Sequence, residues 1–93
     1  MVKKVVKLSA TWCSPCKYYK QRFDNVSKRP EFADIKFEQY DIENDDKCAI
    51  LFKQHHISNI TTTILFDENN NVIDKLIGSV SESELITTIQ NNF

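Results

Sequence analysis

The spacing of apolar residues along the chain predicts four strands. Residues 2–8 are rich in β-branched residues, which indicates a strand. Residues 34–42, 61–66 and 72–77 predict three more strands. The last two strands flank Asp-Glu-Asn-Asn-Asn, a segment of turn-forming residues, so we expect them to form a hairpin.

Three other stretches repeat apolar residues at helical spacing. The first helix is expected from Ser14, with Pro15 in its first turn and Pro30 barring its continuation. Its apolar face consists of Cys16, Tyr19, Phe23 and Val26. A second helix covers residues 45–55. Ser81 and Glu84 have the spacing of a capping box that opens a third helix. The apolar stripe of this third helix is Leu85, Ile86, Ile89 and Phe93.

The resulting order, βαβαββα, predicts an α/β fold in one domain over residues 1–93. The first βαβ unit implies parallel strands with a right-handed crossover, and the hairpin adds antiparallel strands. We therefore expect a four-stranded mixed sheet with helices on both faces. Lys36 and Glu38 lie within the second strand and favour an edge position, because charges discourage unwanted strand pairing there.

Composition and charge exclude several classes of function. The 12 basic and 13 acidic residues give a net charge of −1 and neither sign clusters, so we expect no nucleic-acid partner and no membrane partner. No apolar run is long enough to span a bilayer, and residues 1–10 make a poor signal peptide. The odd count of 3 cysteines argues against a structural disulfide framework. We expect a monomer in a reducing, cytoplasmic compartment.

The segment Thr-Trp-Cys-Ser-Pro-Cys-Lys, residues 11–17, contains the candidate chemistry. Cys13 lies where a strand gives way to a helix, and unpaired backbone N–H groups at a helix start stabilise a thiolate. We expect the pKa of Cys13 to lie below the free value of about 8.5. Cys16 shares the helix face of Tyr19 and Phe23. Cys13 is therefore the expected exposed nucleophile and Cys16 the sheltered resolving cysteine.

Two other interpretations of this pair remain open, a zinc site and an inert pair. Zinc would need further ligands, for which Cys48, His55 and His56 are the soft candidates. The two histidines are adjacent, so on a helix they point about 100° apart and do not easily share one metal. The strand–CxxC–helix context favours redox chemistry, and we expect no metal.

The segment Ala-Thr-Trp-Cys-Ser-Pro-Cys-Lys resembles the thioredoxin active site, usually written WCGPCK. The second strand, the hairpin, Gly78 and the last helix also fall in thioredoxin order, so the resemblance covers nearly the whole chain. It implies a minimal thioredoxin fold without the family's N-terminal strand and helix. It also implies an enzyme that reduces protein disulfides through a Cys13–Cys16 dithiol–disulfide cycle. Such an enzyme needs no cofactor beyond that pair.

The resemblance also implies partners and a substrate-binding surface. The partners would be client proteins with disulfide bonds and an NADPH-dependent flavoprotein reductase. Trp12 resembles the tryptophan that shapes the docking surface, although a lone tryptophan can also be core. Pro15 matches the proline that limits the flexibility of the dithiol. Gly78 matches a glycine that lets a substrate chain approach, or it is a turn glycine at a strand end.

Three positions near the cysteines depart from the family pattern. Ser14 replaces a glycine, and its hydroxyl could donate to a Cys13 thiolate. Lys7 stands where thioredoxins bury an aspartate, and Gln39 stands where they carry its partner lysine. Lys7 then either stabilises a thiolate, acts as the base in its neutral form, or extends to solvent.

The largest departure is Thr61, which replaces the family's cis-proline. A cis bond before a residue other than proline costs about 3–4 kcal/mol, so two alternatives are open for the Ile60–Thr61 bond: trans, which this cost favours, or cis and strained. Ile60 takes over the backbone pairing with substrate that the residue before this proline makes. Thr61 could admit a metal or donate a hydrogen bond to a thiolate.

Two alternative functions follow from these departures. One is a glutaredoxin-like, glutathione-dependent oxidoreductase, which suits the chain length but lacks the usual proline-tyrosine between the cysteines and the paired glycines. The other is a binding module with a thioredoxin fold and weak turnover.

Overall fold

The computed structural model describes residues 3–10, 12–54 and 60–93. Its elements, in chain order, are β1 (Lys3–Ser9), α1 (Ser14–Ser27), a 3₁₀ turn (Pro30–Phe32), β2 (Ile35–Asp41), α2 (Asp46–Gln54), β3 (Thr62–Phe66), β4 (Val72–Ile77) and α3 (Glu82–Asn92). The predicted order βαβαββα is confirmed, and only the 3₁₀ turn is new. The predicted end of the second helix, His55, lies outside the described residues.

The sheet has the strand order β2-β1-β3-β4. β1 pairs with β2 in parallel, while β3 is antiparallel to both β1 and β4. This is the predicted mixed sheet, and β2 occupies the edge that its charged residues indicated. Lys36 and Glu38 form an ion pair across 3.6 Å on that edge strand. β1 is central, and its residues Val5 to Leu8 are all buried.

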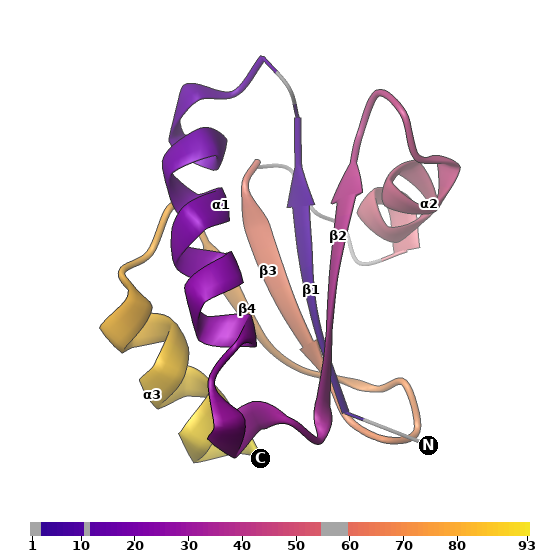
Figure 1. Cartoon of the computed structure of the whole chain (residues 1–93). Coiled ribbons are helices and arrows are strands. Elements are labelled where there is room, and N and C mark those ends of the chain that lie inside the picture. The colour runs from indigo at the N-terminus through magenta and orange to yellow at the C-terminus, as the bar shows by residue number, and fades with distance from the viewer. Residues whose placement is uncertain (1–2, 11, 55–59) are drawn as a thin grey trace.

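Helices cover both faces of the sheet, with α1 and α3 on one face and α2 on the other (Figure 1). Alternation along β1 sends Val5 to the first face and Val6 to the second. The core under α1 and α3 consists of Val5, Tyr19, Phe23, Val26, Phe32, Leu65, Leu85 and Ile89. A smaller core faces α2 and consists of Val6, Leu8, Ile64 and Phe66, with Leu51 packed against it.

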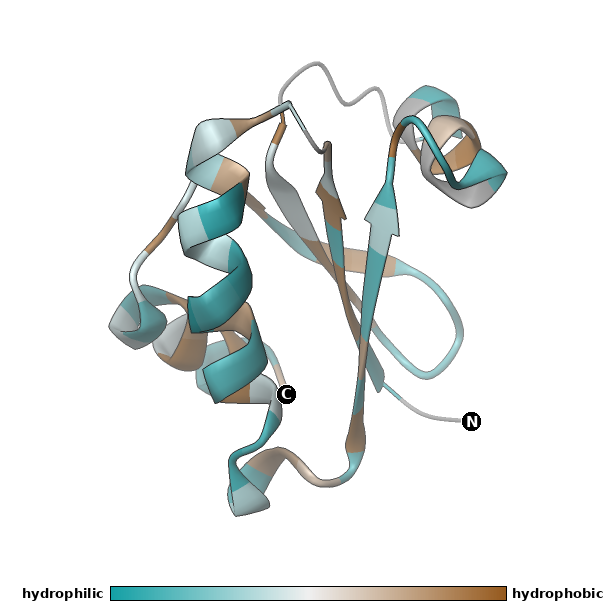
Figure 2. Cartoon of the chain, turned by 45° about the horizontal axis from the view of Figure 1, so that its top comes forward, coloured by the Kyte–Doolittle hydropathy of each residue, from teal (hydrophilic) through white to brown (hydrophobic). Residues whose placement is uncertain are grey.

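The predicted apolar face of α1 is the face that meets the sheet. Cys16, Tyr19, Phe23 and Val26 are its buried residues, and much of the rest of the helix is teal, or hydrophilic, in Figure 2. The Phe23 and Phe37 rings pack edge to face with centroids 5.5 Å apart. No helix in the described part of the chain combines the length and apolarity needed to cross a membrane.

Local side-chain caps fix the ends of the later elements. The Ser81 hydroxyl accepts the Glu84 backbone N–H at 3.1 Å, which confirms the helix start predicted at the capping box. In the hairpin turn, Asp67 Oδ1 accepts the backbone N–H groups of Asn69 and Asn71 at 2.8 and 2.9 Å. Asn70, between them, has a φ of 65°, a conformation that asparagine adopts more readily than most residues.

A buried hydrogen bond ties α1 to the sheet and generates a stability prediction. The Tyr19 hydroxyl and Thr63 Oγ1 lie 2.6 Å apart, and both residues are fully buried. Tyr19→Phe leaves the Thr63 hydroxyl without this partner, so we expect the free energy of unfolding to fall by about 1–2 kcal/mol. Urea denaturation of the oxidised protein measures the change. The double variant Tyr19→Phe, Thr63→Val should lose less than the sum of the single variants, and strict additivity would contradict the coupling.

Candidate active site

The cysteine pair lies at the junction of β1 and α1, where the backbone makes a tight transition. The Cys13 backbone N–H donates to the Ala10 carbonyl oxygen at 3.2 Å. Cys13 then acts as the N-cap of α1, with an extended backbone at φ −89° and ψ 108°. Its Sγ accepts the Cys16 backbone N–H at 3.2 Å. A helix-start N–H is thus directed at the Cys13 sulfur, and this geometry stabilises negative charge there.

Cys13 and Cys16 form a disulfide bond, with their Cα atoms 5.3 Å apart. The prediction that Cys13 is exposed is wrong, because only 6% of it is exposed, against 4% of Cys16. The physical reason is that Ala10 belongs to the same small apolar cluster, and Ile42 and Ile60 pack against it. The difference between the two sulfurs is instead one of neighbours: Cys13 caps the helix, while Cys16 lines a cavity beside β1 and β2.

The residues next to Cys13 in sequence are open to solvent. Trp12 is 66% exposed, so it is not a core residue, and it agrees with the docking-surface interpretation. Ser14 and Pro15 are also exposed, and Pro15 lies in the first turn of α1, where its missing N–H costs no helix hydrogen bond. The hydrogen bond from Ser14 to a Cys13 thiolate stays a prediction, because Cys13 is oxidised here.

Opposite the cysteines, the Ile60–Thr61 peptide bond is cis, so of the two alternatives the favoured one, trans, is wrong. Ile60 packs against the apolar cluster around the cysteines. Thr61 is buried, and its hydroxyl donates to the Leu8 carbonyl oxygen at 2.7 Å. This hydroxyl is therefore bonded to the backbone of β1, whereas one of its two possible roles was a hydrogen bond to a thiolate.

Gly78 lies beside Thr61, since its backbone N–H donates to the Thr61 carbonyl oxygen at 2.8 Å. Its φ of +92° is a conformation that strongly favours glycine, which supports the turn interpretation. A Cβ atom on Gly78 would meet nothing within 4 Å, so space for an approaching chain exists as well. Both interpretations of Gly78 agree with its position.

Lys7 is directed into the interface between the sheet and α1. Only 2% of it is exposed, so the interpretation that it extends to solvent is wrong. Its Nζ lies 5.5 Å from the centroid of the Phe23 ring. Burial lowers the pKa of Lys7 from 10.5 to about 8; the negative charge of Asp24 opposes this shift and the positive charge of Lys20 adds to it.

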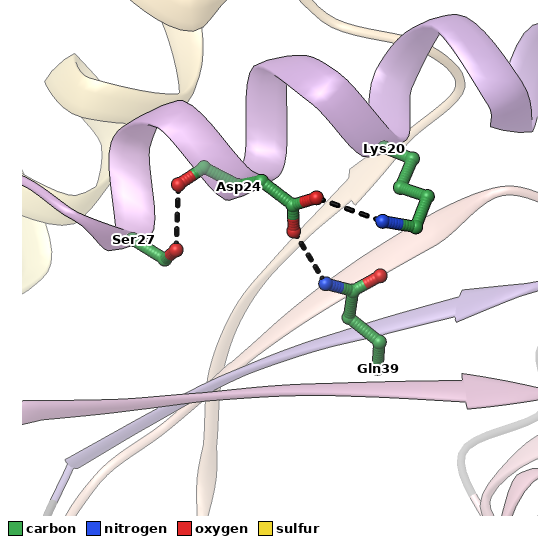
Figure 3. Close-up of polar contacts among 4 residues, drawn as sticks. All are labelled: Lys20, Asp24, Ser27 and Gln39. Carbon is green, nitrogen blue, oxygen red and sulfur yellow. Dashed lines mark hydrogen bonds and ion pairs between the residues drawn. The ribbon is translucent and has the colours of Figure 1, made fainter.

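Asp24, on α1, is the acidic residue of this interface, and sequence reasoning missed it. Its carboxylate accepts from Lys20 Nζ at 2.8 Å and from Gln39 Nε2 at 2.6 Å (Figure 3). Burial acts to raise the pKa of Asp24, but these two hydrogen bonds and the charges of Lys20 and Lys7 outweigh it, so the pKa is lowered. The only signal in the sequence was the spacing of Lys20 and Asp24, four residues apart on one helix.

Lys7 and Cys16 line the same cavity, of about 570 Å³, between α1, β1 and β2. Its other lining residues are Ser9, Ala10, Lys17, Lys20, Gln39, Tyr40, Asp41 and Asp45. The structure therefore brings Cys13, Cys16 and Lys7 together with Ile60, Thr61 and Gly78. Among the side chains that the structure describes, no group of three histidine, cysteine or acidic residues is arranged to hold a metal ion, and the side chain of Cys48 is not among them. His55 and His56 lie outside the described residues.

Comparison with known proteins gives one consistent match. The Thioredoxin family model matches residues 2–91. Over 78 residues the chain is 36% identical to thioredoxin H5 of Oryza sativa, covering 84% of this chain and 53% of that protein. It is 30% identical to a thioredoxin of Mycoplasmoides gallisepticum over 83 residues, covering 89% of this chain and 77% of that protein. The chain thus spans about half the length of the plant relative.

Solved structures agree with the family match. A thioredoxin of Malassezia sympodialis superimposes with a TM-score of 0.83 at 26% identity, covering 97% of this chain and 74% of that one. The oxidised form of mitochondrial thioredoxin 3 from Saccharomyces cerevisiae gives a TM-score of 0.79 at 25% identity, covering 96% of this chain and 77% of that one.

Lys7 generates a prediction about stability and pH. Below about pH 8 the folded protein carries a buried ammonium group, which Lys7→Met removes, so we expect this variant to be more stable by about 1–3 kcal/mol. Between about pH 8 and 10.5 the unfolded chain binds the Lys7 proton and the folded chain does not, so wild-type stability rises with pH. The advantage of Lys7→Met should therefore shrink by about 2 kcal/mol from pH 7 to pH 9.5.

Urea denaturation of the oxidised protein at both pH values measures this difference. Lys4→Met is the matched control, because Lys4 lies on the same strand, is partly exposed and projects to the opposite face. The burial argument would be wrong if both variants gained the same stability with the same dependence on pH.

Proposed function

Because this chain belongs to the thioredoxin family, we propose that it is a thiol–disulfide oxidoreductase that reduces disulfide bonds in proteins. The observation that carries the proposal is the Cys13–Cys16 disulfide at the start of α1, with the Cys16 backbone N–H donated to Cys13 Sγ. This arrangement makes Cys13 the better stabilised thiolate when the pair is reduced, and it therefore acts as the nucleophile.

The reaction proceeds in two exchange steps. The Cys13 thiolate attacks one sulfur of a substrate disulfide, forms a mixed disulfide and releases the first substrate thiolate, which takes up a proton. Cys16 then loses its proton and attacks Cys13 Sγ, which forms the Cys13–Cys16 disulfide and releases the second substrate thiolate. In total two electrons pass from the pair of cysteines to the substrate. Counted from the dithiol, Cys13 and Cys16 each release one proton, and the two substrate thiolates each take one up.

The surface around Cys13 suits an extended protein substrate. Trp12 is exposed next to the nucleophile, and Ile60 lies against the cysteine cluster. Gly78, one hydrogen bond from Thr61, leaves open space where a side chain would otherwise stand. In this proposal Trp12, Ile60, Thr61 and Gly78 form the substrate-binding surface, and Ser14 and Pro15 form its part between the cysteines.

The wider setting of the reaction follows from the same proposal. The dithiol is the whole redox group, so the cycle runs without a bound cofactor. Client proteins with disulfide bonds consume the reduced form. An NADPH-dependent flavoprotein reductase regenerates it, which makes the chain an electron carrier in cell redox homeostasis. We place this cycle in the cytoplasm and propose that the chain acts as a monomer.

Reduction of insulin disulfides, driven by dithiothreitol, tests the activity. The wild-type chain should accelerate the reaction and Cys13→Ser should abolish the acceleration, because the nucleophile is lost. Cys48→Ser is the matched control, since it removes the cysteine outside the pair. A wild-type rate equal to the uncatalysed rate would sink the proposal and favour a binding module.

A second variant tests the roles of the two cysteines. Cys16→Ser removes the resolving thiol, so the mixed disulfide between Cys13 and substrate should accumulate. Non-reducing electrophoresis and mass spectrometry detect this adduct. The roles of the two cysteines would be reversed if the Cys13→Ser variant formed an adduct on Cys16 and the Cys16→Ser variant formed none on Cys13. Turnover of a glutathione mixed disulfide with glutathione as reductant would instead indicate the glutaredoxin-like alternative.

A further inference from the structure

The layer between α1 and the sheet contains polar groups that the two exchange steps do not yet use. Lys7 lies at its centre on β1, opposite Gln39 of β2 and Thr63 of β3 in the strand register. The Thr63 hydroxyl is bonded to Tyr19, and the Gln39 amide is bonded to Asp24. Both strand neighbours of Lys7 thus have their own partners on α1. None of the ion pairs among the described residues includes Lys7.

We propose that Lys7 is a positioning residue that acts on substrate through Cys16: its ammonium group stabilises the Cys16 thiolate in the cavity they share, and Asp24 keeps that ammonium group charged. This inference rests on the proposed function and adds to it the residue that favours the thiolate form of the resolving cysteine. It follows from the placement of Lys7 and Cys16 on the wall of one cavity and from the position of Asp24 on the facing helix.

The proton balance of the second exchange step defines what Lys7 does. When the mixed disulfide has formed, Cys16 must become a thiolate before it can attack Cys13 Sγ. If Lys7 is neutral, it takes the Cys16 proton and becomes an ammonium group. If it is already protonated, the proton leaves to water and the existing charge stabilises the thiolate. Once the Cys13–Cys16 disulfide forms, the thiolate is gone and Lys7 can return a proton to solvent or to the departing substrate thiolate.

Burial has the largest effect on the pKa of Lys7, and the charges around it modify that effect. From α1 it faces Asp24, whose negative charge raises the pKa of Lys7, and Lys20, whose positive charge lowers it. Lys17 of α1, Tyr40 and Asp41 of β2, and Asp45 after β2 also line the cavity. Burial is the largest influence and brings the pKa of Lys7 to about 8. An amine with this pKa can hold or accept a proton under conditions in which a thiol also ionises.

Among the charged residues that line the cavity with Cys16, only Lys7 is buried, since Lys17 and Lys20 are exposed and Asp41 and Asp45 are partly exposed. Tyr19 is buried next to Cys16 on α1, but burial raises the pKa of its hydroxyl to about 12 and that hydroxyl is bonded to Thr63. Gln39 does not ionise, and Asp24 is bonded to Lys20 and Gln39. Lys7 therefore remains the group that can respond to the charge on Cys16.

The pKa of Cys16 tests the inference without any turnover. The double variant Cys13→Ser, Cys48→Ser keeps Cys16 as its only cysteine. In this variant the ¹³C NMR shift of Cys16 Cβ is followed against pH. Lys7→Met should raise the pKa of Cys16 by about one unit or more, because the thiolate loses a nearby positive charge. Lys7→Arg keeps the positive charge, so the pKa of Cys16 should stay close to its value with Lys7.

Matched variants separate this electrostatic effect from a structural one. Lys4→Met removes a lysine charge from the opposite face of β1 and should leave the Cys16 titration unchanged. Lys7→Gln, which is neutral but polar, should raise the pKa of Cys16 as Lys7→Met does. An unchanged pKa of Cys16 in Lys7→Met would overturn the proposal, as would an equal change in Lys4→Met. These outcomes do not depend on insulin reduction, so the proposed function can fail while this inference holds, and the reverse.

Asp24→Asn tests the second half of the inference. The asparagine keeps an oxygen for Lys20 and loses the negative charge, so the Lys7 pKa should fall below about 8. The ¹³C NMR shift of Lys7 Cε in the oxidised protein measures it. An unchanged or higher Lys7 pKa in Asp24→Asn would remove Asp24 from the proposal.

Discussion

The hydrogen bond from the Cys16 backbone N–H to Cys13 Sγ is the contact on which the site and α1 both depend. It makes Cys13 the N-cap, so the helix begins at Ser14 and its phase along the chain is set. That phase turns Cys16 toward the cavity and, further along, turns Tyr19 and Phe23 onto the sheet. One contact thus joins the chemistry of the sulfur to the packing of the core.

Elements that are determined by interactions between residues close in the sequence could be predicted from it. β4 was predicted at residues 72–77 and found there, because its apolar run ends at turn residues on both sides. The start of α3 followed from Ser81 and Glu84, which cap the helix through neighbouring atoms. The edge position of β2 followed from Lys36 and Glu38, whose charges suit a strand with one open side. In each case the causes lie within a few residues of the effect.

Features of the site that depend on contacts across the fold could not be predicted in the same way. Cys13 is buried because Ile42 and Ile60 arrive from distant parts of the chain. Lys7 looked like a residue that could reach solvent, and only the packing of Phe23 over its strand shows that it stays inside. Asp24 was not predicted as a site residue, because its spacing from Lys20 indicates only a surface ion pair and its contact with Gln39 joins residues 15 positions apart. The cis bond at Ile60–Thr61 ran against the intrinsic preference of a threonine peptide.

The central position of β1 has a mechanical consequence for a protein that is covalently joined to its substrate during turnover. A pull that a bound client exerts on Cys13 is carried toward the N-terminus through Ala10 into β1, and toward the C-terminus into α1, which Cys13 caps. β1 has hydrogen-bonded neighbours on both sides, β2 and β3, so such a load spreads over three strands at once. The nucleophile is therefore anchored between a central strand and the helix that it caps, while the edge strand β4 is not directly joined to it.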